Sequence, residues 1–133
     1  MTAGFSAHGV KALGFRIAMT DKRKVSTMKP GFTYILTNTN NTTLYVGVTS
    51  NIVERVKQHK QKRDPKSFTA RYNLDKLVYY EVFQMIGDAI GREKQLKAGS
   101  RATKVALIDG ANPEWLDLFE EVKAEFGDDG LED

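Results

Sequence analysis

The sequence predicts an α+β fold in which a small three-stranded antiparallel sheet is flanked by helices. Two strand-type segments are separated by a short polar turn, which requires antiparallel pairing. The hydrophobic pattern then changes to helical periodicity, returns to one more strand-type run and ends in helices, in the order ββαβααα. A chain of 133 residues is long enough for one domain with a single modest core.

The predicted sheet begins after Pro30-Gly31. Residues 32–37 are aromatic and β-branched, as is typical of a strand, and residues 43–48 form the returning strand after a turn of asparagines and threonines. The apolar run at residues 76–83 predicts the third strand. Gly47 lies inside the second strand and indicates either a β-bulge or a place where a ligand backbone comes close.

The first helix is predicted directly after the hairpin. Asn51 and Glu54 have the spacing of an N-cap and its capping-box acid, and the helix is expected to reach about Lys62, before Asp64-Pro65. A loop over residues 65–75 then leads into the third strand.

Three further helices are predicted in the carboxy-terminal half. Asp88 can cap a helix over residues 88–98 that Gly99 ends, and a short helix over residues 101–108 stops at Gly110. Asn112-Pro113 is a helix-start signal, because proline fits the first helical position, and predicts a helix over residues 113–126.

Charge divides the chain into three parts. Residues 1–27 carry a net charge of +4 with little apolar bulk, and we expect a disordered basic extension. Residues 28–113 carry fourteen basic and seven acidic side chains, as a small nucleic-acid binder should, whereas residues 114–133 carry nine acids against Lys123. The folded domain is therefore expected over residues 28–118, and residues 119–133 are the end of the last helix and an acidic tail.

Composition excludes several kinds of site. The chain has no cysteine, so disulfides and thiolate metal sites are excluded, and two histidines are too few for a multi-histidine zinc site. No apolar run approaches the roughly 18 residues of a membrane span, and the first residues lack the apolar core of a secretory signal. A cytoplasmic protein without a membrane partner is the simplest expectation.

Four side chains near the hairpin suit phosphate chemistry. Arg55 and His59 stand one turn apart on the same helix face, and the hairpin presents Tyr34 and Tyr45 as cross-strand or diagonal neighbours. Taken singly, such residues are more often solvated or packing side chains. Together they place two phenols, a guanidinium and an imidazole near one another, which indicates a site that grips or cuts a phosphodiester.

Glu93 is the most unusual residue of the second long helix. It lies within an apolar stripe marked by Ala89, Ile90 and Leu96, where a carboxylate is costly unless it is satisfied. One explanation is an ion pair with one of three neighbouring cations: Arg92, Lys97 or Arg101. The other is a single-carboxylate Mg²⁺ site completed by water and phosphate oxygens.

Two further groups of side chains are candidates for nucleic-acid binding. Arg71 and Tyr72, with Phe68, combine charge and aromatic rings in a way that suits stacking on an unpaired base or contact with a backbone. A loop anchored on the core by an aromatic residue is the equal alternative. The second group, which could contact phosphates or simply be a solvated face, comprises Lys57, Lys60, Lys62, Arg63 and Lys66.

The order and spacing of these residues resemble the GIY-YIG nuclease superfamily. The resemblance covers about residues 29–118, and it rests on the spacing Tyr34…Tyr45-Val46-Gly47…Arg55…His59…Glu93. Within the superfamily, the chain is similar to small standalone single-domain proteins related to the N-terminal nuclease domain of the bacterial excinuclease C protein. Further similar phrases are Leu44-Tyr45-Val46-Gly47-Val48-Thr49, Gln58-His59-Lys60, Arg92-Glu93-Lys94-Gln95-Leu96-Lys97 and Asn112-Pro113-Glu114-Trp115.

The resemblance implies an endonuclease that hydrolyses DNA with the help of Mg²⁺ or Mn²⁺. Glu93 would hold the metal ion, and Arg55 would bind the scissile phosphate. Tyr34 or Tyr45 would be the general base. His59 stands at a position where members of the family carry histidine or tyrosine. Branched, nicked or single-stranded DNA is the expected substrate, with a role in DNA repair, and RNA is the alternative. A partner protein could supply specificity. The alternative function is a nucleic-acid-binding module of this fold with little activity of its own.

The chain departs from the family pattern at three places. The first motif is Phe32-Thr33-Tyr34 rather than Gly-Ile-Tyr, and Val48 stands where some members have a lysine. Asn112 is a weak match to a late family asparagine, because an asparagine before proline is also an ordinary N-cap.

Overall fold

A three-stranded antiparallel sheet is the centre of the protein. The computed structural model describes residues 29–127. Strands β2 (Gly31–Thr37), β3 (Leu44–Thr49) and β4 (Lys76–Phe83) pair in the order β3-β2-β4, which confirms the predicted α+β class and all three strands. The helices are α3 (Ile52–Lys60), α4 (Phe68–Arg71), α5 (Ile86–Ala98), α6 (Arg101–Ala111) and α7 (Phe119–Phe126).

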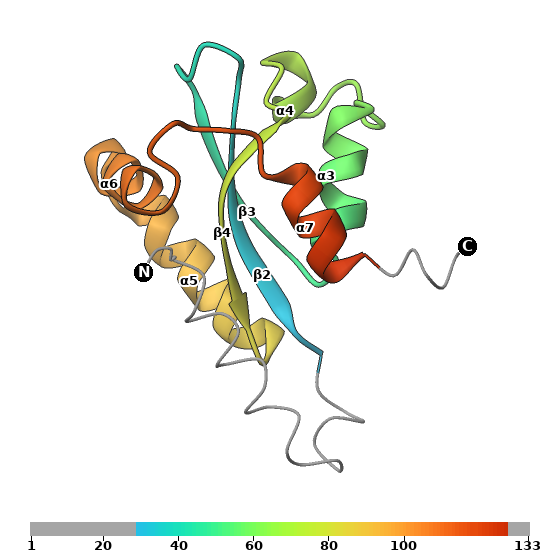
Figure 1. The fold of residues 1–133 in the computed structure, drawn as a ribbon, viewed down its shortest axis with the longest axis vertical. Helices are drawn as coiled ribbons and strands as arrows, with labels where there is room; N and C mark the ends of the chain where they lie inside the picture. The colour runs from blue at the N-terminus through green and yellow to red at the C-terminus, as the bar shows by residue number, and fades with distance from the viewer. Residues whose placement is uncertain (1–28, 128–133) are drawn as a thin grey trace.

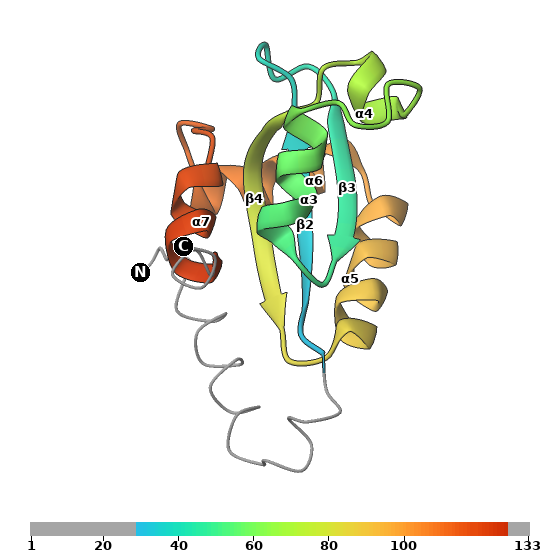
Figure 2. The ribbon, with the colours of Figure 1, turned by 90° about the vertical axis from the view of Figure 1, so that its right-hand side faces the viewer.

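Helices cover both faces of the sheet. Figure 1 shows the sheet nearly edge-on, with α3 and α7 on one side and α5 and α6 on the other. In the view turned by 90°, α3 lies in front of the sheet and α5 runs beside the edge strand β3 (Figure 2). Of the helices within residues 29–127, none has the length and apolar character that a membrane span needs.

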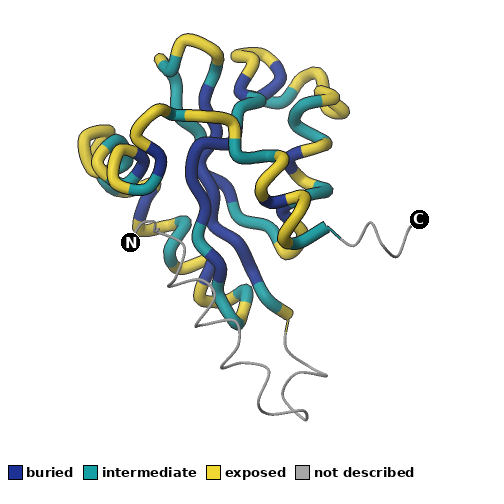
Figure 3. Tube along the Cα trace, viewed as in Figure 1, coloured by how far each residue is buried: buried dark blue, intermediate teal, exposed yellow. Residues whose placement is uncertain are grey.

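The central strand β2 supplies both halves of the core. All seven of its residues are buried (Figure 3), because helices pack on both faces of the strand. Successive side chains point to opposite faces, so Tyr34 and Leu36 face α3 and α7, whereas Ile35 faces α5 and α6. The phenol of Tyr34 is thereby turned toward the helix that carries Arg55 and His59.

The structure confirms the predicted N-cap of the first helix, α3. The Oδ1 atom of Asn51 accepts a hydrogen bond of 3.1 Å from the backbone N–H of Glu54. The helix ends at Lys60, two residues earlier than predicted, because Lys62 takes a left-handed conformation with a φ of 51°. Its N–H donates to the carbonyl of His59 at 3.1 Å, which closes the helix end.

Two elements begin where the sequence did not place them. The segment predicted as a loop contains the short helix α4, whose N-cap Ser67 accepts a hydrogen bond from Ala70 N–H at 3.2 Å. Helix α5 begins at Ile86, so Asp88 lies in its first turn and is not its N-cap. The backbone N–H of Ile86 donates to the carbonyl of Lys29 at 2.8 Å. Docking of the helix start against the entry of β2 therefore decides where α5 begins.

The helix predicted over residues 113–126 is wrong in its first six residues, since α7 begins at Phe119. Asn112 is instead the C-cap of α6 and is buried. Its Nδ2 donates to the carbonyls of Val78 (3.1 Å) and Leu116 (2.8 Å), and its Oδ1 accepts from Leu116 N–H at 3.1 Å. These bonds tie the loop to β4 and override the local helix-start signal.

Candidate active site

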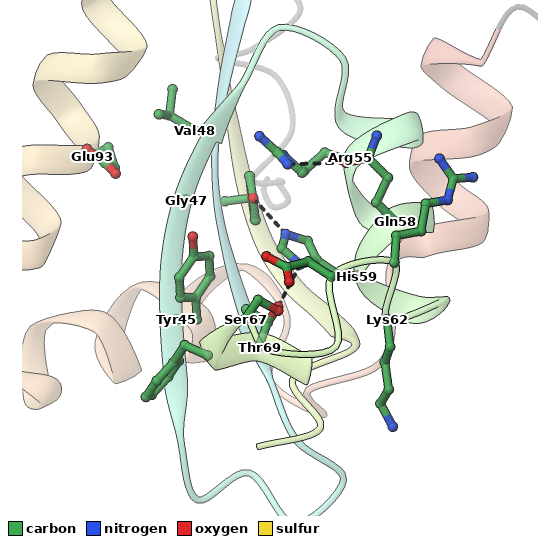
Figure 4. Close-up of a pocket in the computed structure, with 14 residues that line it drawn as sticks. Tyr45, Gly47, Val48, Arg55, Gln58, His59, Lys62, Ser67, Thr69 and Glu93 are labelled. Atoms are coloured by element: carbon green, nitrogen blue, oxygen red, sulfur yellow. Dashed lines mark hydrogen bonds between the residues drawn. The ribbon is translucent and has the colours of Figure 1, made fainter. Parts of the chain in front are cut away.

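One cavity brings together the five residues that the sequence singled out for chemistry. It measures about 290 Å³, and its lining includes Tyr34, Tyr45, Arg55, His59 and Glu93. They come from four elements, namely β2, β3, α3 and α5. In Figure 4, Arg55 and His59 extend from α3 on one side of β3, and Glu93 extends from α5 on the other side. The cavity therefore spans the edge of the sheet.

The innermost part of the cavity is a hydrogen-bonded chain. The hydroxyl of Tyr34, a residue only 2% exposed, lies 3.1 Å from Nε2 of His59. The other ring nitrogen, Nδ1, lies 2.9 Å from Oγ1 of Thr69 (Figure 4). Burial, and then the charge of Arg55, lower the pKa of His59 to about 4, so the imidazole is neutral near pH 7. Burial, followed by the neighbouring Tyr45, raises the pKa of the Tyr34 hydroxyl, which keeps its proton.

A neutral His59 has one N–H, so two tautomers are compatible with these contacts. With the proton on Nδ1, the Tyr34 hydroxyl donates to Nε2 and Nδ1–H donates to Oγ1 of Thr69; with the proton on Nε2, both hydrogen bonds reverse. In the Nδ1–H tautomer, the oxygen of Tyr34 keeps its lone pairs free to accept. His59 can therefore receive the phenol proton if the Tyr34 oxygen takes one from another molecule.

Gly47 makes room for this chain. It lies directly opposite Tyr34 in the β2–β3 register, and a Cβ atom there would overlap the Tyr34 hydroxyl oxygen. Strand β3 pairs regularly with β2, so the β-bulge that Gly47 could have marked is not formed; the irregularity lies between Ile35 and Leu36, on the β4 side. The close approach that requires glycine is made by the Tyr34 ring of the protein itself.

Tyr45 occupies the outer part of the cavity. Its partner across the strands is Leu36, so it is a diagonal neighbour of Tyr34 and lies on the same face of the sheet. The two rings are 6.4 Å apart between centroids, and the Tyr45 ring meets His59 edge to face at 5.9 Å. Tyr45 is only partly buried, which leaves it accessible to a ligand.

Arg55 is a guanidinium of the cavity lining whose side-chain partner is a neutral amide. Its NH1 donates to the neutral amide of Gln58 at 3.1 Å (Figure 4). Arg63 also lines the cavity, but it is paired with Glu54 at 2.8 Å. Within residues 29–127, Arg55 and Lys62 are thus cations of the lining that no carboxylate pairs, since the Lys62 ammonium donates to the neutral amide of Asn73, and both can attract an anion.

Glu93 is one of the two carboxylates that line the cavity, the other being Asp64. Of the three cations that the sequence offered as partners, Lys97 pairs with it, at 2.7 Å from Oε2, and the Glu93 side chain is 13% exposed. Arg92 instead forms a bidentate ion pair with Glu81, with Nε 2.9 Å from Oε1 and NH2 3.0 Å from Oε2. Arg101 donates to the carbonyls of the β2–β3 turn.

The donor set around Glu93 suits a hard cation with few protein ligands. Among residues 29–127 no three or more histidine, aspartate or glutamate side chains cluster as a metal cage would require. Mg²⁺ is commonly held by one or two carboxylates, with water and substrate phosphate oxygens completing its coordination. A largely buried glutamate in a cavity that Arg55 also lines fits that chemistry.

The predicted basic residues do not all gather at the cavity. Lys62 and Arg63 line it. Lys60 is held elsewhere: its ammonium pairs with Asp117 at 2.5 Å and donates to the carbonyl of Asp75 at 2.8 Å. Lys57 and Arg71 are exposed outside the cavity lining, as is Tyr72, and the buried Asn112 lies outside it too.

The sequence analysis missed two residues that build the site, Thr69 and Gln58, and left the role of a third, Lys97, undecided. Thr69 holds the second nitrogen of His59, Gln58 orients Arg55, and Lys97 balances Glu93. Lys97 was one of three equivalent candidates. Thr69 carried no signal at all, because the segment around it was predicted as a loop; Ser67, as an N-cap, could have indicated the short helix that positions it.

Acid should destabilise the fold through His59. Its folded-state pKa of about 4 lies below the ordinary value of 6.5, so the stabilising contribution of the neutral ring is complete above pH 6.5 and is lost progressively as the pH falls through 4. The pKa shift alone corresponds to roughly 3 kcal/mol of unfolding free energy. Because His59 is partly exposed, we expect a loss of about 2 kcal/mol.

Urea unfolding at pH 7 and pH 4 measures this effect, with His59→Gln as the matched control. The wild type should lose about 2 kcal/mol more than the variant over this interval. Equal losses in the two proteins would contradict a neutral, buried His59.

The fold and the cavity define a small α+β protein with two phenols, an arginine, a histidine and a single glutamate around one anion-suited hollow. The sequence profile of the GIY-YIG catalytic domain matches residues 30–106. The chain therefore belongs to the GIY-YIG family.

Its relatives include shorter proteins that match this chain over most of their own length. It is 36% identical over 87 residues to a UPF0213 protein of Syntrophus aciditrophicus (strain SB), covering 65% of this chain and 98% of that protein. It is 32% identical over 78 residues to a UPF0213 protein of Pediococcus pentosaceus, covering 59% of this chain and 81% of that protein. A solution NMR structure of a UPF0213 protein from Bacillus halodurans is 26% identical, covers 65% of this chain and 92% of its own, and has a TM-score of 0.41.

Proposed function

We propose that the protein is a divalent-metal-dependent endonuclease that hydrolyses phosphodiester bonds in DNA. The observation that carries the proposal is the cavity in which the Tyr34–His59 pair and Arg55 face Glu93 across strand β3. Membership of the GIY-YIG family supports the reaction class. The net positive charge of residues 28–113 supports a polyanionic substrate.

The scissile phosphate binds at Arg55. The guanidinium offers paired N–H donors whose geometry matches phosphate oxygens. Its contact with Gln58 leaves further N–H groups for the substrate. Because negative charge increases on the phosphate oxygens as the nucleophile attacks, Arg55 stabilises the transition state more than the bound ground state.

The proton of the attacking water passes to Tyr34. In the Nδ1–H tautomer of His59, the phenol oxygen accepts this proton as the phenol gives its own proton to Nε2, which lies 3.1 Å away. The negative charge of a bound phosphate stabilises the imidazolium that results. It therefore raises the pKa of His59, against the effect of burial, which lowers it. Tyr45, whose ring meets His59 only edge to face, is then a wall of the cavity and a substrate contact.

Glu93 is the residue that would hold Mg²⁺ or Mn²⁺. When bound, the ion supplies charge stabilisation to the leaving oxygen and the phosphate. Glu93 keeps its position through Lys97, whose ammonium lies on one carboxylate oxygen.

The second candidate function is a nucleic-acid-binding module with little activity of its own. The observation that favours it is the same ion pair, since an ammonium 2.7 Å from Oε2 of Glu93 competes with a metal ion for that oxygen. A partner protein that displaced Lys97 would then be needed for cleavage.

The deciding experiment is cleavage of labelled single-stranded, duplex, nicked and branched DNAs with Mg²⁺, with Mn²⁺ and with EDTA. We expect cutting of at least one substrate with either metal and none with EDTA, because the proposed reaction needs the ion. Salt-sensitive binding without cutting under any condition would reject the nuclease in favour of the binding module. An identical RNA panel tests whether DNA is the preferred substrate.

A further inference from the structure

Two aromatic rings extend outward from the cavity along α4. Phe68 forms part of the cavity wall, and its ring lies 6.4 Å from that of Tyr45 at an interplanar angle of 29°. The ring of Tyr72 follows at 4.7 Å from Phe68. Phe68 and Tyr72 are each 47% exposed. The protein thus presents a row of aromatic surface that begins inside the site and ends in solvent.

The way α4 is built shows that these rings are held outward. Ser67 caps the helix, and the two buried residues, Thr69 and Ala70, occupy its inner face. Phe68, the first residue of the helix, and Tyr72, its C-cap, are four residues apart and consequently lie on the same, outer side. Thr69 is also hydrogen-bonded to His59 at 2.9 Å, so the helix that carries the rings is fixed to the hydrogen-bonded chain of the cavity.

The surroundings of the rings are basic. The guanidinium of Arg71 lies 5.8 Å from the centre of the Tyr72 ring, and exposed Lys66 precedes the helix. Lys62 lines the adjoining cavity. An exposed aromatic pair bordered by cations is suited to a nucleic-acid strand, whose bases stack on the rings and whose phosphates meet the charges.

We propose that Phe68 and Tyr72 form a stacking platform for an unpaired nucleobase next to the phosphate that enters the cavity. This inference rests on the proposed function and narrows its substrate to strands with an unpaired nucleotide at the cleavage position. A base within continuous duplex is already stacked on its neighbours and would have to be extruded at a cost of a few kcal/mol. Single-stranded DNA and the unpaired nucleotides at a branch do not carry that cost.

Binding in EDTA tests the platform separately from hydrolysis. The probe is a fluorescein-labelled single-stranded DNA of about ten nucleotides, in the size range of one single-strand binding site. A series of such strands carries one abasic position each, and each is titrated with wild type and with Phe68→Ala. In the wild type, one abasic position should weaken binding roughly 5- to 150-fold, the range that loss of one base–aromatic stack produces.

The discriminating result comes from combining the abasic substitution in the DNA with the Phe68→Ala substitution in the protein. In Phe68→Ala, the intact strand should bind roughly 5- to 150-fold more weakly, and the same abasic position should cause no further loss. Phe68→Trp should retain wild-type affinity and the abasic effect, because tryptophan also stacks. The control Leu116→Ala removes a side chain that is 57% exposed outside the cavity lining, and it should leave binding unchanged.

The platform is overturned if Phe68→Ala binds the intact strand as tightly as the wild type, or if the abasic loss is the same in both proteins. Since the titrations contain no metal, these outcomes do not depend on whether the protein cleaves. A protein that shows the platform in EDTA and never cuts would reject the nuclease alone. A protein that cuts but has no abasic-sensitive position would reject the platform alone.

Discussion

Replacement of Glu93 by glutamine should lower metal-dependent cleavage by about 10³-fold or more. The proposed ion contributes several kcal/mol to the transition state, and each 1.36 kcal/mol corresponds to a tenfold change in rate. The amide retains the shape of the carboxylate but not its charge. The measurement is single-turnover cleavage of the best substrate from the panel, together with Mn²⁺ binding followed by electron paramagnetic resonance.

The fold of Glu93→Gln should be intact. Its ion pair with Lys97 joins residues four apart on a helix and is worth about 0.5 kcal/mol or less. Binding of DNA in EDTA should be unchanged or slightly tighter, because a negative charge near the phosphate is removed. Glu120→Gln is the matched control, since that carboxylate is 81% exposed on α7 and paired with Lys123. Wild-type cleavage or wild-type Mn²⁺ affinity in Glu93→Gln would remove this residue from the proposed metal site.

Loss of the Tyr34 hydroxyl should reduce the rate of cleavage by about 10²- to 10⁴-fold, the usual contribution of a positioned general base. Tyr34→Phe leaves the ring in its place against Gly47 and deletes the oxygen that is bonded to His59. The matched variant is Tyr45→Phe, which removes a phenol from the same cavity without breaking the chain to His59. We expect it to slow cleavage by a clearly smaller factor.

Stability and kinetics together separate the roles of the two tyrosines. Tyr34→Phe should cost about 1 kcal/mol of unfolding free energy, because it removes one hydrogen bond, and this is too little to unfold a domain. Thermal unfolding checks that value beside the rate. If Tyr45→Phe slowed the reaction as much as Tyr34→Phe or more, the proton would not pass through the Tyr34–His59 pair.

Local signals were sufficient for much of the fold. The strand predicted at residues 76–83 matches β4 at both ends, and the predicted cap at Asn51 is the cap of α3. Alternating apolar residues and N-cap side chains act over a few neighbouring positions, so they can be read from the chain directly. The sequence likewise established the family and selected the five residues that the structure places in one cavity.

The predictions that were wrong are those in which a distant contact outweighed a local signal. Asn112 precedes a proline, yet its amide is bonded to β4 and to Leu116, and α7 starts only at Phe119. The start of α5 is decided by a bond between Ile86 and Lys29, far away in the chain. The side chain of Asn112 is buried, and the free energy of leaving its amide unpaired exceeds the local preference for a helix start.

The sequence by itself determined the strands, the first helix, the basic central block and the identity of the five cavity residues. Only the tertiary structure decided which of these residues contact one another. Strand register made the two tyrosines diagonal neighbours, packing of α3 joined His59 to Tyr34, and α4 turned Phe68 toward solvent beside the site. These relations depend on contacts between residues distant in the chain, and a pattern of neighbouring residues does not encode which of several possible partners will meet.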